Sequence, residues 1–123
     1  MSAMTKPIQI GSQINYTNAG ETKINGRDIV ALTDLCGIAQ ADIAPGETGV
    51  LILSGVHEVP AIGTAAFTVG QVVYWDTANA KATNVATGNT ALGVVTAPKA
   101  AAGTTARVRI GFPVVIPTAA ANG

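Results

Sequence analysis

Apolar and polar residues along this chain follow a short-range pattern that is typical of β-strands. In Ala106-Arg107-Val108-Arg109-Ile110 the two kinds alternate, which predicts a strand whose Val108 faces away from Arg107 and Arg109. The longest apolar run, residues 49–56, predicts a strand that is buried on both faces and ends within residues 57–60. Turn signals close the runs: Asn25-Gly26 suits the positive φ angles of a tight turn, and Ala44-Pro45-Gly46 predicts another.

Short runs of this kind recur along the chain and indicate the fold class. They cover residues 7–10, 14–16, 22–24, 28–32, 35–39, 49–56, 67–76, 82–85, 92–95 and 106–110. About eight short strands at intervals of about ten residues, with no helical period, predict an all-β fold, a small single-domain β-barrel or β-sandwich. We expect an extended N-terminal arm over residues 1–20, a β-domain over 21–111 and an extended C-terminal tail over 112–123, where two prolines allow at best an edge strand.

Composition and charge narrow the class of partner. The chain is 48% hydrophobic, but alanine supplies much of that share and aromatic residues only 4%. Seven basic and seven acidic residues cancel, so the surplus of cations that binds phosphate is missing and we expect no nucleic-acid partner. No apolar stretch approaches the roughly 18 residues of a membrane helix, and residues 1–6 do not resemble a secretion signal. We therefore expect a protein that is made and folded in a cytoplasm and has no membrane partner.

A search for catalytic motifs favours no enzyme class. No glycine is followed by lysine, so the chain has no phosphate-binding P-loop. One histidine and one cysteine cannot build a zinc site, and we expect neither a metal nor a cofactor. His57 could act as a base for Cys36 or a serine, and Asp76 could act as an acid, but no spacing requires these roles. A strand-end histidine that packs or meets a partner, and a small buried cysteine, explain the first two residues better, so we expect no enzyme.

Five stretches, in order along the chain, resemble the phage capsid cement (decoration) protein family. The most distinctive is Val72-Val73-Tyr74-Trp75-Asp76, a tyrosine-tryptophan-aspartate that ends a strand. The others lie at residues 37–49, 55–60, 87–94 and 107–110, so the resemblance spans residues 24–110. His57 stands where the family usually has an aromatic residue, which indicates a more exposed position, and the tail beyond Gly111 is longer than is typical. Family members are often labelled predicted RecA/RadA-family phage recombinase, and the missing P-loop and short chain argue against that label here.

The resemblance implies a structural virion protein. Such a protein decorates and stabilises the outer surface of a phage capsid by bridging major capsid protein subunits, so its place would be the capsid surface of the virion. A closed homo-oligomer would match a symmetry axis of the shell, with a trimer as the first expectation and a dimer as the second. The alternative is a virion-displayed carbohydrate- or surface-binding β module, which would need a cleft lined by exposed aromatic residues.

Candidate contacts with the capsid or a second copy come first from the two ends of the chain. Both ends are alternately apolar, and such arms can add a strand to the open sheet edge of a neighbour. The residues concerned are Ile8, Ile10, Ile14 and Tyr16 at the N-terminal end and Val114 and Ile116 at the C-terminal end.

Two strands supply the remaining candidates. Arg107 and Arg109 share one strand face, which is either a solvated surface or the site of interface salt bridges. Tyr74 and Trp75 are adjacent and so face opposite ways, which predicts that one lies in the core and the other serves an interface, with Trp75 as the candidate.

Overall fold

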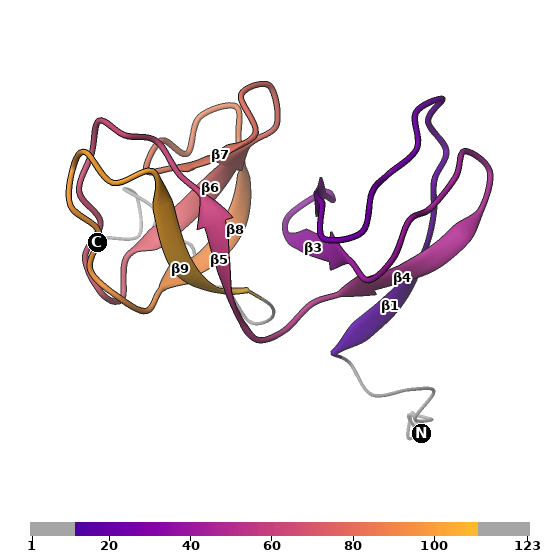
Figure 1. Ribbon diagram of the computed structural model, residues 1–123, viewed down its shortest axis with the longest axis horizontal. Helices are drawn as coiled ribbons and strands as arrows, with labels where there is room; N and C mark the ends of the chain where they lie inside the picture. Colours follow the sequence, from indigo (N-terminus) through magenta and orange to yellow (C-terminus); the bar gives the residue numbers. More distant parts are fainter. Residues whose placement is uncertain (1–11, 111–123) are drawn as a thin grey trace, which may run out of the picture.

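The fold is all-β, as the strand pattern predicts. A computed structural model describes residues 12–110, and in these residues it has nine strands in two sheets and no helix (Figure 1). The strands are β1 (Gln13–Thr17), β2 (Ile29–Ala31), β3 (Cys36–Ala39), β4 (Thr48–Ile52), β5 (Val56–Pro60), β6 (Val72–Asp76), β7 (Lys81–Thr83), β8 (Thr90–Val95) and β9 (Thr105–Ile110). The two sheets make a sandwich-like arrangement, and the described strands do not close a barrel.

The first sheet has the order β1-β4-β3-β2 and is antiparallel throughout. Residues 13–17 of the expected arm therefore form an edge strand, in which Gln13 to Thr17 pair with Ile52 to Thr48. Glycine allows Ile43 to pack closely on this sheet, because a Cβ at Gly49 would lie 2.5 Å from Ile43 Cγ1. The predicted strand at residues 22–24 is reduced to an isolated bridge between Ile24 and Ile43.

The second sheet has the order β5-β9-β8-β6-β7 and curls on itself. A parallel bridge joins Ala61, just after β5, to Ala82 in β7 and so brings the two edges of the sheet together. Inside the sheet, β8 and β9 approach closely at Gly93, where a Cβ would overlap the carbonyl of Arg109. This position therefore requires glycine for a reason of space and not of backbone angle.

The longest apolar run does not form one strand. Residues 48–52 form β4 in the first sheet, residues 56–60 form β5 in the second, and the chain crosses between the sheets at residues 53–55 (Figure 1). Gly55 has a φ of 93°, which other residues rarely adopt, and it breaks the run at that point. The prediction of a strand buried on both faces is wrong, because Leu51 is buried but Val56 is 55% exposed.

Two further local predictions are corrected. The strand predicted for residues 67–76 begins only at Val72, because Gly70 turns the chain with a φ of 91°. The turn at Asn25-Gly26 is present, but its positive φ of 76° falls on Arg27. Hydrogen bonds on both sides hold Arg27 there: its N–H donates to the Ala39 carbonyl, and the Asp28 side chain accepts the N–H of Asn25.

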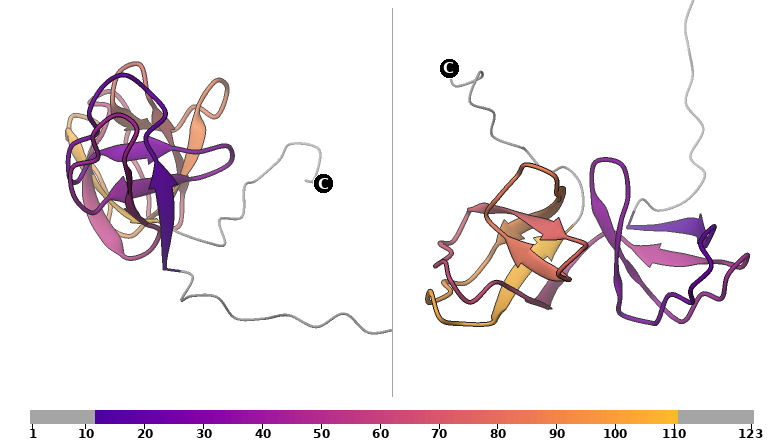
Figure 2. Two further views of the ribbon diagram at one scale, coloured as in Figure 1. Left: turned by 90° about the vertical axis from the view of Figure 1, so that its right-hand side faces the viewer. Right: turned by 90° about the horizontal axis from the view of Figure 1, so that it is seen from above.

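The main core fills the curled second sheet and is covered on one side by β3 of the first sheet, and a smaller core lies on the other face of the first sheet. In the main core, Cys36 and Ile38 of β3 meet the inward residues of the second sheet, among them Val73, Leu92 and Val108. In the smaller core, Ala39, Ile43 and Leu51 are fully buried, but the apolar residues around them are only partly covered. The two sheets stay recognisable as side-by-side units when the molecule is seen from above (Figure 2).

A buried lysine, Lys99, joins loops of the second sheet through hydrogen bonds to their carbonyl groups. Lys99 is only 6% exposed, and its ammonium donates to the carbonyls of Ala65 (2.6 Å), Ala100 (2.9 Å) and Ala101 (3.4 Å). It also lies 4.9 Å from the ring centre of Phe67, and the backbones of Lys99 and Phe67 are joined by two hydrogen bonds. Three carbonyls and an aromatic face thus take the place of a carboxylate partner.

Candidate interaction surface

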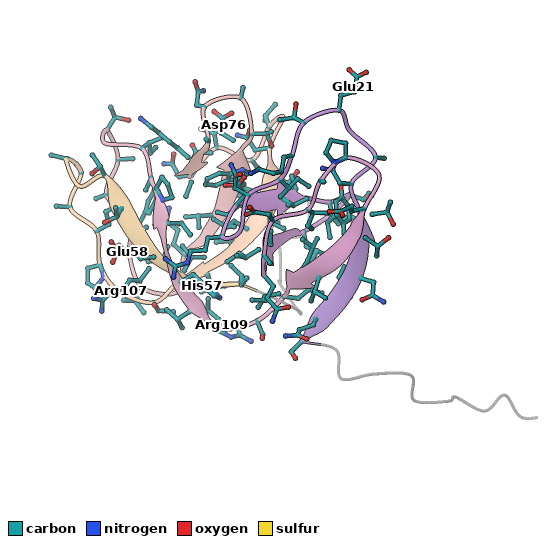
Figure 3. All side chains as sticks on the ribbon, turned by 45° about the vertical axis from the view of Figure 1, so that its right-hand side comes forward. Glu21, His57, Glu58, Asp76, Arg107 and Arg109 are labelled. Carbon is teal, nitrogen blue, oxygen red and sulfur yellow. The ribbon has the colours of Figure 1, made fainter. Side chains whose placement is uncertain are left out.

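The outward face of β5 and β9 gathers most of the exposed charge on the second sheet. The alternation in β9 is as predicted: Val108 is fully buried, and Arg107 and Arg109 are exposed on the opposite face. Antiparallel pairing sets Glu58 opposite Arg107 and Val56 opposite Arg109. Residues directly opposite each other share a sheet face, so these four side chains form one patch, which we call the β5–β9 face. Figure 3 labels Glu58, Arg107 and Arg109 of this face.

The charges of the β5–β9 face have no partner inside the described chain. Within residues 12–110 the one ion pair is Lys23–Asp42, at 3.5 Å, and it lies on the first sheet. The side chains of Glu58, Arg107 and Arg109 are exposed and form no hydrogen bond with another described residue. Two guanidinium groups, one carboxylate and an exposed valine therefore have no partner among residues 12–110, and guanidinium groups suit carboxylate partners.

Two of the four residues of this face, Arg107 and Arg109, were predicted from the sequence as candidate contacts. The other two, Glu58 and Val56, were not. The alternation of Val56-His57-Glu58-Val59 already placed Val56 and Glu58 on one side of a strand. The pairing of β5 with β9 was the missing information, because the two strands lie about fifty residues apart in the chain.

The two N-terminal candidates that the structure describes belong to the first sheet. Ile14 and Tyr16 alternate with exposed residues along β1, and both are half-buried against the smaller core. They stabilise that core while keeping part of their surface open. Ile8, Ile10, Val114 and Ile116 lie outside the described residues.

Trp75 is buried, and it lines a hollow between the sheets. Both Tyr74 (7% exposed) and Trp75 (6% exposed) are buried. Trp75 shares the main core with Val73, two residues before it in β6, whereas Tyr74 is not part of that core, so the two adjacent side chains face opposite ways as predicted. Trp75 lines two adjoining hollows of about 540 and 580 Å³, and Asp28, Ile29 and Ala80 line both as well. We call these hollows together the inter-sheet cleft.

Residues considered for catalysis have structural roles. Cys36 is 1% exposed, and burial raises the pKa of its thiol to about 12, which keeps it protonated and unreactive. The His57 ring nitrogen Nε2 lies 2.9 Å from the Ser54 carbonyl oxygen, and the residue is half-buried. Asp76 accepts hydrogen bonds from the side chain and the backbone of Asn79, which lower the pKa of its carboxyl group and fix the turn after β6.

Two further searches of the described residues give negative results. Residues 12–110 contain no group of three or more His, Cys, Asp or Glu side chains that could hold a metal ion. The same residues contain no helix that is long and apolar enough to cross a membrane.

The chain was compared with known proteins. No curated protein and no solved structure matches it. A family model described as phage cement protein matches residues 8–110, which includes every strand described above and reaches into the N-terminal segment that holds Ile8 and Ile10. Since this match covers most of the sequence, the chain belongs to the phage cement protein family.

Proposed function

We propose that this protein decorates the outer surface of an assembled phage capsid and stabilises it by bridging neighbouring major capsid protein subunits. The observation that carries the proposal is the β5–β9 face, whose exposed charges have no partner in the described chain. A face with both signs of charge and an exposed valine suits a protein surface that offers the complementary arrangement. Many weak contacts of this kind add up on a shell, because symmetry presents each of them in many copies.

The N-terminal segment is the proposed second contact. The β1 strand is an edge of the first sheet, and the chain enters it from residues 8–11. These residues lie inside the family match and contain Ile8 and Ile10 in alternation with Gln9. An extended segment of this kind can pair with an exposed strand of a capsid subunit.

Closed cyclic symmetry is the proposed assembly on the shell, a trimer before a dimer. A protein that sits on a local symmetry axis contacts two or more capsid subunits at once, which is what bridging requires. The protein needs no catalysis or cofactor for this role, and we propose that it is not an enzyme. We also propose that it is made in the host cytoplasm and has no nucleic-acid partner.

Co-sedimentation with purified shells that lack the protein tests these contacts. The full chain should pellet with the shells up to a fixed ratio. Deletion of residues 1–11 leaves every described strand in place and should abolish pelleting, and Arg107→Glu with Arg109→Glu should weaken it at least tenfold. Lys81→Glu, an exposed charge change on β7, is the matched control and should bind like the parent. Full occupancy by both altered proteins would refute the proposed contacts.

The alternative of a carbohydrate-binding module has less support. Among the described aromatic residues, Phe67, Tyr74 and Trp75 are buried and Tyr16 is half-buried in the smaller core. Residues 12–110 therefore offer no exposed aromatic platform on which a sugar ring could stack.

A further inference from the structure

The inter-sheet cleft is an apolar depression in a protein that otherwise buries its large side chains well. Its floor is formed by Ile29, Ile38, Ile52 and Trp75, which come from both sheets. Each of its two parts has the size of a pocket that holds a drug-sized ligand, a range of about 300–1,000 Å³. Its lining includes Lys23 and Arg27 and also Asp28 and Glu58, so charges of both signs are present in equal number. An uncharged apolar occupant fits such a cleft better than an ion does.

We propose that the inter-sheet cleft is the docking site of this chain's own C-terminal tail, with residues 112–116 as the apolar insert. The tail begins close to the cleft. The N–H of Ile110 donates to the carbonyl of Gly55 at 3.0 Å, and His57 and Glu58, two and three residues after Gly55, line the cleft. Thirteen residues follow Ile110, and in extended form they span roughly 40 Å, more than enough to cross the cleft.

The composition of the tail matches the cleft. Residues 111–123 contain no charged side chain, and they include Phe112, Val114, Val115 and Ile116. Pro113 and Pro117 flank the aliphatic run and favour an extended backbone, which lowers the entropy lost on docking. The cleft also borders β5, the edge strand of the second sheet, whose residues 57–60 can offer backbone groups to an extended segment.

The N-terminal segment is a weaker candidate for the cleft. It enters the fold at Ser12, whose carbonyl accepts the N–H of Leu53 at 2.8 Å. It joins β1, which lies at the opposite edge of the first sheet from β2 and does not line the cleft. It also carries a charged residue, Lys6. The two ends of the chain therefore have different roles, the tail in the cleft and the N-terminal segment outward.

Energy transfer from Trp75 tests the proposal on the full chain. Trp75 is the one tryptophan of the sequence and lines the cleft, so it is a site-specific donor. A cysteine placed at Thr118 takes a thiol-reactive acceptor dye, while the buried Cys36 does not react in the folded protein. We expect strong transfer that does not depend on protein concentration. Val114→Asp with Ile116→Asp should remove most of it, and Val85→Asp, on an exposed valine, should leave it unchanged.

Three results would overturn the proposal. The first is transfer that is equal in the parent and in the Val114→Asp, Ile116→Asp protein. The second is transfer that rises with concentration, which would place the tail in the cleft of a second copy. The third is stronger transfer from Trp75 to a dye at Thr5→Cys than to a dye at Thr118→Cys, provided that Ile8→Asp with Ile10→Asp removes this transfer. That result would assign the cleft to the N-terminal segment. Equal melting temperatures of the variants confirm that each is folded.

Discussion

Replacing Lys99 tests how this small fold tolerates a buried cation without a carboxylate. Lys99→Met keeps an unbranched stem of similar length and removes the ammonium. The three carbonyls that accept its protons then lose their donor, and the contact with Phe67 loses its charge.

The size of the effect follows from these contacts. A hydrogen bond to a charged group contributes about 1.5–3 kcal/mol, and a cation over an aromatic ring about 0.5–2 kcal/mol. The carbonyls of Ala100 and Ala101 belong to an exposed turn where water can replace the ammonium, so the half-buried Ala65 carbonyl, at 2.6 Å, carries most of the loss. The variant also avoids the cost of burying a cation, which offsets part of that sum. We expect a net loss of about 2–3 kcal/mol in the free energy of unfolding.

Urea unfolding followed by Trp75 fluorescence measures this loss. With a slope of about 1–3 kcal/mol per molar urea, the midpoint of Lys99→Met should fall by roughly 1 M at an unchanged slope. Lys81→Met, on an exposed lysine, is the control and should shift stability by less than about 0.5 kcal/mol. If Lys99→Met is as stable as the control, the carbonyls and the ring do not hold the ammonium in the way described.

Three further changes have outcomes set by the structure. Gly93→Ala should destabilise the domain by more than about 3 kcal/mol or prevent folding, because its Cβ would overlap the Arg109 carbonyl. Gly88→Ala, at a turn glycine with open space around it, is the control and should lower the free energy of unfolding clearly less. Equal losses of the two variants in chemical denaturation would contradict this prediction. Burial in the folded protein raises the pKa of Cys36 from 9.0 to about 12. The protonated thiol therefore contributes its full share to the free energy of unfolding below pH 9, and this share should decline between pH 9 and 12. Cys36→Ala should remove that part of the decline, and an unchanged pH profile would argue against a buried thiol. Asp76→Ala should lower the free energy of unfolding at pH 7, because it removes the acceptor for Asn79. Since folding lowers the pKa of Asp76, the difference in stability between the variant and the parent should disappear as the pH falls below the usual range of an aspartate. A difference that persists at pH 2 would mean that packing, and not charge, holds this turn.

Strand content was predictable from the sequence, but the division of the strands between two sheets was not. Alternation identified β9 and the buried side of Val108, because a half-buried strand repeats every two residues. The run at residues 49–56 gave no sign that Gly55 would turn the chain from one sheet into the other, since an apolar run looks the same in one long strand and in two short ones.

The candidate surface was predictable only in the parts that depend on one strand. Arg107 and Arg109 were found because they share a face of β9, while Glu58 and Val56 entered the patch through pairing that no local pattern encodes. Trp75 was predicted at an interface because adjacent strand residues face opposite ways, but Trp75 belongs to the main core, and Tyr74, which lies outside that core, is buried as well. Whether one face of a strand or both are covered depends on tertiary contacts, so a single sequence does not reveal it.

A cryo-electron microscopy map of shells saturated with the purified protein tests the proposed function most directly. The account predicts density that spans the contact between two or more major capsid protein subunits, with the β5–β9 face, marked by Glu58, Arg107 and Arg109, against the shell. Density confined to a single capsid subunit, or a β5–β9 face that points to solvent, would contradict it.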